Sequence, residues 1–99
     1  MTTDNTTTNH AREGNVARVR FLLDRGARMD VCTQWNEDDE PRCGTALMFA
    51  SRAGHLDVAR LLIERGANVS AARIGDGFTA LMWASLKGHL EIAQLLVEG

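Results

Sequence analysis

The side chains of this sequence that are most suited to catalysis or metal binding are its histidines and an acidic run. His55 and His89 each follow a glycine, and the chain has no His-x-x-His or Cys-x-x-Cys pair spaced like zinc ligands. The acidic run, Glu37 to Glu40, lacks the alternation and the glycine of an EF-hand calcium loop. No glycine-rich phosphate loop precedes a helix pattern. We therefore expect no catalytic residues, no metal and no cofactor, and we do not expect an enzyme.

Cys32 and Cys43 flank one irregular segment of the chain. Two cysteines are too few to hold a fold together through disulfides. The Thr- and Asn-rich start, residues 1–9, lacks the charged and apolar regions of a secretory signal. We therefore expect a cytoplasmic protein with reduced thiols. If the segment folds back and brings the two sulfurs together, a disulfide or a redox switch is the alternative.

Length and charge narrow the remaining classes of function. The chain has 99 residues, which suits one domain, and a formal net charge of −2. Nucleic-acid-binding proteins normally present a strongly basic face. No apolar run approaches the ~20 residues that a membrane-spanning helix requires. We expect neither nucleic acid nor a membrane as a partner.

One sequence pattern occurs three times and organises the chain. Its copies begin at Gly14, Gly54 and Gly88, and each continues with apolar residues at helical spacing. Repetition at such intervals indicates stacked units, because each unit has an apolar face that only a neighbour can cover. Polar positions stay in register and predict an exposed back face, formed by Ala17, Arg20 and Asp24, by Asp57, Arg60 and Glu64, and by Glu91, Gln94 and Glu98.

A second helical segment precedes the last two copies. Residues 45–54 and 79–88 match almost position for position. Both begin with a threonine, which is placed to cap a helix by accepting a backbone N–H. We expect Leu47 and Leu81, at equivalent positions, to face the core.

The segments that connect the units differ in length. Gly26 and Gly66 are expected to end the preceding helices, since glycine tolerates the left-handed conformation of a helix terminus. The connecting segment after Gly26 is longer than the one after Gly66, and its additional residues lie within 33–43, a range that is acidic and includes Trp35. These additional residues are either an insertion at an exposed loop tip or a loop that binds a specific partner.

With these motifs the chain resembles the ankyrin repeat family. The resemblance rests on Thr-Ala-Leu-Met-x-Ala-Ser-x-x-Gly-His-Leu-(Asp/Glu)-x-Ala-x-Leu-Leu, which occurs at residues 45–62 and 79–96. It implies an all-α solenoid, a stack of helix-turn-helix units with projecting hairpin loops. We expect one repeat domain at 10–99, with repeats at about 10–40, 41–74 and 75–99, after a flexible or capping lead at 1–9.

The chain departs from the family pattern in two informative places. Met48 and Met82 replace a histidine that joins neighbouring repeats in the family, so we expect soft apolar packing there. Gly99 aligns with Arg65, one residue before the glycine that should close the last helix. That helix is also apolar over a wide arc. We therefore expect about two and a half to three repeats of a longer array, or self-association through the 88–99 helix face.

The resemblance implies binding to another protein through the hairpin tips and the concave face of the inner helices. Phe49 and Trp83 occupy equivalent inner-helix positions, and if exposed they would anchor an acidic or amphipathic segment. The other interpretation is that both rings are buried between repeats. The further candidate positions are Trp35, Pro41, Arg42, Gly44, Arg52 and Ala53, together with Gly75, Asp76, Phe78, Leu86 and Lys87.

Asn68 is a possible modification site. It resembles the asparagine that a cytosolic hydroxylase modifies in eukaryotic ankyrin repeats, although asparagine also serves turns through local hydrogen bonds. The sequence as a whole predicts a scaffold-type protein–protein interaction module. The alternative is a structural or engineered repeat protein without a partner of its own.

Overall fold

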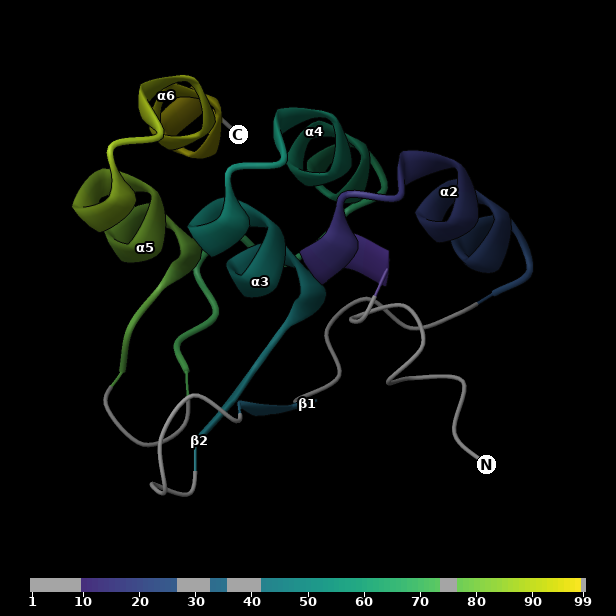
Figure 1. Cartoon of the computed structure of the whole chain (residues 1–99), viewed down its shortest axis with the longest axis horizontal. Coiled ribbons are helices and arrows are strands. Elements are labelled where there is room, and N and C mark those ends of the chain that lie inside the picture. The colour runs from purple at the N-terminus through teal and green to yellow at the C-terminus, as the bar shows by residue number, and fades with distance from the viewer. Residues whose placement is uncertain (1–9, 27–32, 36–41, 74–76, 99) are drawn as a thin grey trace.

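The computed structural model describes residues 10–26, 33–35, 42–73 and 77–98. Within these ranges, three helix pairs stand side by side (Figure 1). The pairs are a short helix at residues 10–13 with α2 (Val16–Asp24), α3 (Ala46–Ala53) with α4 (Leu56–Glu64), and α5 (Ala80–Lys87) with α6 (Leu90–Glu98). The arrangement confirms the expected all-α repeat stack.

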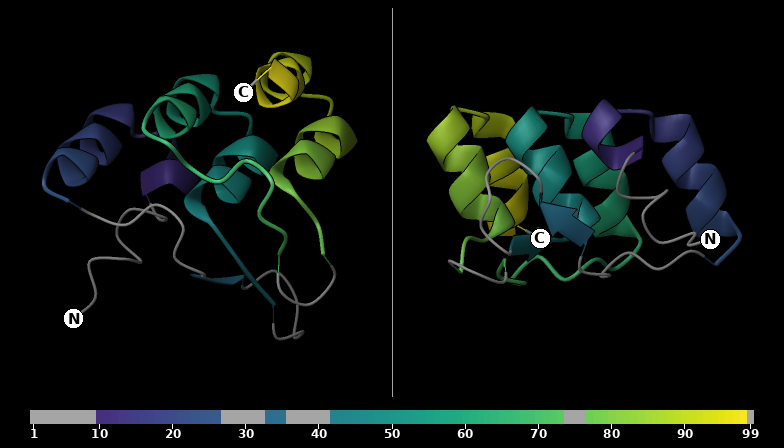
Figure 2. Two further views of the ribbon diagram at one scale, coloured as in Figure 1. Left: turned by 180° about the vertical axis from the view of Figure 1, so that it is seen from behind. Right: turned by 60° about the horizontal axis from the view of Figure 1, so that its bottom comes forward.

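The helices form two layers. Figure 1 shows α2, α4 and α6 in an outer row, and the 10–13 helix, α3 and α5 in an inner row from which hairpins extend. The right view of Figure 2 shows the helices side by side along the stack, with the hairpins gathered at one end. One hairpin pairs β1 (Thr33–Trp35) antiparallel with β2 (Arg42–Gly44), and a second closes with a bridge between Ala72 and Thr79.

Threonines start the inner helices, as the sequence predicts. Thr45 Oγ1 accepts the N–H of Met48 at 3.4 Å, and Thr79 Oγ1 accepts the N–H of Met82 at 3.2 Å. The first turn of a helix leaves backbone donors without partners inside the helix, and these hydroxyls satisfy one of them in each case.

Glycines in the left-handed conformation end five of the described helices, and one of them is Gly14, which has a φ of +79° and follows the short helix at residues 10–13. Gly26 and Gly66, predicted for this role, have φ values of +90° and +95° and directly follow the C-caps of α2 and α4. Gly54 and Gly88 are themselves the C-caps of α3 and α5, with φ values of +85° and +78°. A residue with a Cβ adopts this conformation at a cost of about 1–2 kcal/mol, so glycine is favoured at these helix ends.

The core is centred on the middle helix pair. Residues 46–51 of α3 are all buried, and α4 contributes Val58, Ala59, Leu61 and Leu62. Val19 of α2 and Ile92 of α6 close the core from either side. Because the middle pair has a neighbour on both sides, α4 is the outer helix with the most buried residues.

The prediction that Leu47 and Leu81 both face the core is right for Leu47 and wrong for Leu81. Leu47 is 2% exposed and Leu81 is 37% exposed. The next residues differ in the same way, since Met48 is 1% exposed and Met82 is 50% exposed. The residue types are identical, but α5 packs against α3, and no other described helix covers the corresponding side of α5. The expected apolar packing therefore holds for Met48 and not for Met82.

No described helix has the length and apolar content needed to cross a membrane. The lead at 1–9, Cys32, the acidic run and the side chain of Cys43 lie outside the described residues, so the expectations for them remain predictions.

Candidate functional site

The inner helices carry two arginine–aromatic pairs, each formed across a unit boundary. The guanidinium carbon of Arg12 lies 4.6 Å from the ring centroid of Phe49, and that of Arg52 lies 5.3 Å from Trp83. Cation–π contacts of this kind contribute about 0.5–2 kcal/mol, more when water is excluded. Both arginines stand two residues before the glycine that ends their inner helix, so one contact recurs from unit to unit.

A third arginine extends the second pair toward the hairpin. The guanidinium of Arg73, a residue only 4% exposed, lies 4.9 Å from the Trp83 centroid and 5.8 Å from that of Phe78. Phe78 packs on Trp83 with ring centroids 5.0 Å apart. The N–H of Arg73 also donates to the carbonyl of Phe78 at 2.6 Å, which holds the two arms of this hairpin together. We call Arg52, Arg73, Phe78 and Trp83 the inner-face cluster.

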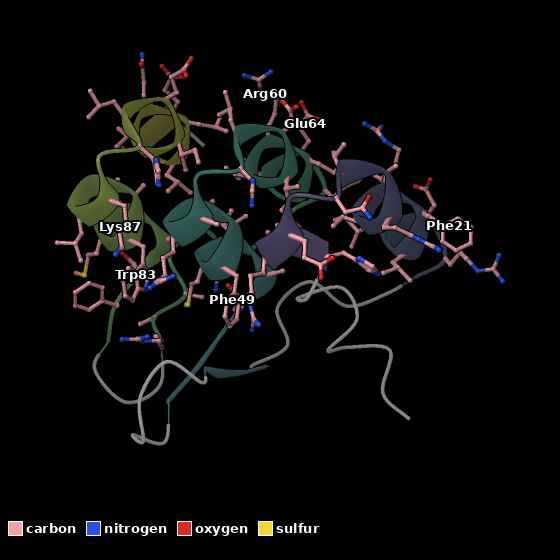
Figure 3. All side chains as sticks on the ribbon, in the orientation of Figure 1. Phe21, Phe49, Arg60, Glu64, Trp83 and Lys87 are labelled. Carbon is pink, nitrogen blue, oxygen red and sulfur yellow. The ribbon has the colours of Figure 1, made fainter. Side chains whose placement is uncertain are left out.

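Phe49 and Trp83 do not form an exposed aromatic stripe. They are 5% and 8% exposed, although Figure 3 shows both on the hairpin side of the inner helices. The alternative interpretation, burial between repeats, describes both rings, because arginines from the neighbouring unit cover them. Beside the inner-face cluster, the side chains of Leu86 and Lys87 are exposed to solvent, and that of Leu86 is 64% exposed.

The other predicted positions are only partly brought together. Arg52 is half-buried beside Trp83, Ala53 is exposed, and Gly44 is buried. Trp35 and Arg42 lie opposite each other in the β1–β2 pair, but their side chains are not described. Pro41, Gly75 and Asp76 lie outside the described residues.

Charge is distributed unequally between the two layers. Helices α3 and α5 contain Arg52 and Lys87 and no acidic residue. The predicted back-face stripe of Asp57, Arg60 and Glu64 is exposed, and Figure 3 shows Arg60 and Glu64 on the outer layer, away from the labelled inner-helix rings. Exposed charges of mixed sign contribute little to stability, which fits a solvated face. Helices α3 and α5 therefore carry only basic charge, whereas the outer helices carry charges of both signs.

Sequence reasoning missed Arg12 and Arg73. A signal for Arg12 was present, because it occupies the same place before a glycine as Arg52, a residue that was singled out. Arg73 lies in a connecting segment, where no periodicity marks which side chains face the helices.

Histidines join consecutive units through hydrogen bonds. The Nε2–H of His55 donates to the backbone carbonyl of Arg12 at 2.9 Å, and that of His89 donates to the carbonyl of Arg52 at 3.2 Å. Since a carbonyl oxygen can only accept, the proton lies on Nε2 in both rings. The two residues that cover aromatic rings with their side chains therefore also hold the next unit with their backbone.

Each of these histidine rings lies directly against a glycine. A Cβ added to Gly14 would stand 2.5 Å from Nδ1 of His55, and a Cβ added to Gly54 would stand 2.6 Å from Cε1 of His89. No side chain fits in that space. The positive φ and the close approach of the ring thus require glycine independently of each other.

Asn68 is exposed and takes part in a turn. Its Oδ1 accepts the N–H of Ser70 at 3.0 Å, and its carbonyl accepts the N–H of Ala71 at 3.3 Å. The bond to Oδ1 accounts for asparagine at this place, since the other bond uses the backbone carbonyl, and modification of Asn68 stays a prediction. Among the described residues, no three His, Cys, Asp or Glu side chains are grouped so that they could hold a metal ion.

Comparison with known families identifies the repeat type. Residues 7–99 match the family model described as ankyrin repeats in three copies. The matched range takes in all three helix pairs, the inner-face cluster and both glycine–histidine contacts.

Curated proteins that are similar to this chain are named for their ankyrin repeats. Ankyrin repeat domain-containing protein 29 of Danio rerio is 45% identical over 64 residues, which are 64% of this chain and 19% of that protein. Ankyrin repeat, SAM and basic leucine zipper domain-containing protein 1 of Ovis aries is 35% identical over 57 residues, which are 58% of this chain and 10% of that protein. The matched residues therefore span between a tenth and a fifth of the length of these relatives.

Proposed function

Since the chain belongs to the ankyrin repeat family, whose repeats generally mediate protein–protein interactions, we propose that it is a binding module for an acidic or amphipathic segment of another protein. The partner segment lies along the inner helices and the hairpin side of the stack. The proposal involves no catalysis, and the partner is neither nucleic acid nor a membrane.

The observation that carries the proposal is the separation of charge between the two layers. On α3 and α5 the charged side chains are Arg52 and Lys87, and the buried Arg73 adds its positive charge at the Trp83 ring that Arg52 also contacts. The outer helix α4 carries the exposed acidic residues Asp57 and Glu64 on either side of Arg60, so its charge is mixed. An acidic segment is therefore attracted to the inner face and repelled from parts of the outer face, which favours one docking orientation.

Apolar contact is available beside these cations. Leu86 is 64% exposed at the end of α5, next to Lys87, and Phe78 is half-buried at the edge of the inner-face cluster. A segment that alternates acidic and aliphatic residues would pair its carboxylates with the cations and place its apolar side chains on Leu86 and Phe78. The hairpin positions Trp35, Arg42 and Asp76 enter the proposal through the family resemblance.

Selection from a random peptide display library tests the proposal. We expect the chain to enrich peptides that combine Asp or Glu with Leu, Ile or Phe. The charge-reversing variant Lys87→Glu should weaken binding of the enriched peptides by about tenfold, since a charged contact of ~1–2 kcal/mol becomes repulsive. The matched control is Arg60→Glu, a charge reversal at a residue that is also exposed but lies on the outer layer.

Two results would count against this function. One is enrichment of peptides without acidic residues. The other is equal weakening by Lys87→Glu and Arg60→Glu, which would mean that binding responds to net charge and not to the inner face. A chain that enriches nothing supports the alternative, a structural repeat protein without a partner of its own.

A further inference from the structure

An ion pair joins the outer helices of the first two units. Nη2 of Arg65, the residue that caps the C-terminus of α4, donates to Oδ1 of Asp24, the last residue of α2. Glu98 ends α6 at the position that Asp24 has in α2, and Arg25 follows α2 at the position that Arg65 has after α4. The third unit therefore carries the carboxylate of such a pair, and the first unit carries the cation.

Apolar side chains of the outer helices are exposed at both ends of the row. Leu90 and Val97 of α6 are 76% and 71% exposed. The residues at these two positions in α2 and α4 are partly buried, and they are Val16, Leu23, Leu56 and Ile63. Phe21 of α2 is 48% exposed, whereas Leu61, at the same position in α4, is 4% exposed and lines one groove with residues of α2. Inside the stack, an outer helix that lies alongside covers these positions.

The two ends of the outer row carry opposite charge. At the α2 end, the guanidinium carbon of Arg25 lies 5.2 Å from the ring centroid of Phe21, and Arg18 lies on the same side of the helix, three residues before Phe21. Asp24, the acidic residue of α2, is engaged in the ion pair with α4. Helix α6 carries two acidic residues and no basic one, and Figure 1 shows it at the opposite end of the row. Copies that meet through the same end bring like charges together, whereas opposite ends attract each other.

We propose that α2 of a second copy of this chain docks on α6, so that copies join head to tail. Arg25 of the second copy pairs with Glu98, as Arg65 pairs with Asp24 inside the chain, and Phe21 of the second copy packs on the exposed apolar side of α6. Such a contact joins two different surfaces and leaves one of each free, so it extends into a row of copies. The contact lies in the outer layer, and it does not depend on the partner binding proposed for the inner helices.

The contact between copies should be weaker than the contacts between units. The second copy offers Asn15 at the position of His55 and His89, so the hydrogen bond that each histidine makes to the preceding unit is missing. The Oδ1 of Asn15 accepts the N–H of Arg18 at 3.2 Å and is engaged within its own unit. Small interfaces of this kind are typical of weak complexes. We therefore expect monomers at roughly 1 µM and reversible association toward roughly 1 mM.

Sedimentation velocity over this range of concentration tests the proposal. Reducing buffer prevents Cys32 and Cys43 from linking copies. We expect the average mass to rise with concentration and to pass that of a dimer. Phe21→Asp and Val97→Asp should each lower the association constant at least about tenfold, because each places a carboxylate in an apolar contact. Both residues are exposed, so the variants should fold, and circular dichroism checks this.

Mixing the two variants distinguishes a head-to-tail contact from any other. Phe21→Asp keeps an intact α6 surface, and Val97→Asp keeps an intact α2 surface. Each variant alone should stay monomeric. The mixture should form one-to-one dimers and nothing larger, because the one productive contact in it uses both intact surfaces.

A charge exchange identifies the ion pair between copies. Arg25→Glu and Glu98→Arg should each lower the association constant about tenfold, and the double variant should recover most of the loss. Glu64→Arg is the matched control, because it reverses the charge at the position of Glu98 in the second unit. It should leave the association constant unchanged.

Three results would overturn the proposal. The first is an unmodified chain that stays monomeric at roughly 1 mM. The second is association that stops at the dimer and is insensitive to Phe21→Asp, which would mean that the α6 surfaces of two copies pair with each other. The third is a mixture of Phe21→Asp and Val97→Asp that stays monomeric although the unmodified chain associates.

Discussion

The Nε2–H of His55 donates a hydrogen bond to the backbone carbonyl of Arg12, 2.9 Å away and 43 residues earlier in the chain. The guanidinium of the same arginine covers Phe49, which belongs to the same unit as His55. A single residue thus holds the next unit through its backbone and its side chain. Arg52 makes the same two contacts with the last unit, so this double contact joins each unit to the next.

Removal of either histidine should weaken the contact between consecutive units. We expect His55→Ala and His89→Ala each to lower the free energy of unfolding by about 1–2 kcal/mol, because each leaves a carbonyl without its donor. Urea denaturation followed by circular dichroism measures this change. Glutamine, which keeps an N–H donor, should recover part of the loss at either position. If glutamine and alanine are equivalent, the hydrogen bond contributes nothing and the ring acts by packing.

The glycines under the histidine rings should be less replaceable than glycines of similar φ in open space. We expect Gly54→Ala to lower the free energy of unfolding by about 2–4 kcal/mol, from backbone strain and from collision with His89. Gly66→Ala is the matched control, because its φ is +95° and nothing lies within 4 Å of its added Cβ. It should lower the free energy by about 1 kcal/mol. Equal effects of the two substitutions in chemical denaturation would contradict the described contact.

Equivalent leucines in the second and third units should respond differently to truncation. Leu47→Ala removes a side chain that is 2% exposed and should destabilise by about 2–5 kcal/mol. Leu81→Ala removes one that is 37% exposed and should destabilise by about 1 kcal/mol. Thermal or urea unfolding of the two variants gives the comparison. A loss at Leu81 as large as that at Leu47 would show that the end of the stack is covered in solution.

One buried hydroxyl is expected to destabilise the native chain. Ser51 is 0% exposed, and its Oγ has no hydrogen-bond partner among the described residues. Ser51→Ala should therefore raise the free energy of unfolding by about 1 kcal/mol. The variant has no hydroxyl that must give up its hydrogen bonds to water on folding, and alanine has a higher helix propensity than serine. Ser85→Ala, at the exposed equivalent position, should give only the helix-propensity part, ~0.5 kcal/mol or less. A lower stability of Ser51→Ala would mean that the hydroxyl has a partner in solution.

The sequence predicted what depends on one unit alone. Capping by Thr45 and Thr79 and helix termination at Gly26 and Gly66 follow from local backbone chemistry, and the structure confirms them. The back-face stripe follows from helical periodicity within each copy. Such features need no knowledge of how far one helix lies from another.

What the sequence did not predict depends on contacts between units. The repetition of the Leu47 helix predicts a buried Leu81, but burial depends on a neighbour that α5 lacks among the described elements. The sequence leaves the burial of Trp83 open, because whether Arg52 reaches across to it depends on the offset between helices. That offset is a property of the stack, and the residue types do not determine it.

Amide chemical-shift mapping would show whether a partner segment binds the inner helices. The labelled chain would be titrated with an acidic peptide obtained from the display selection. We expect shifts at Arg52, Leu86 and Lys87, and unchanged amides at Asp57 and Arg60 on the outer layer. Shifts concentrated on α4 and α6, with the inner helices unchanged, would mean that the partner does not bind the inner face.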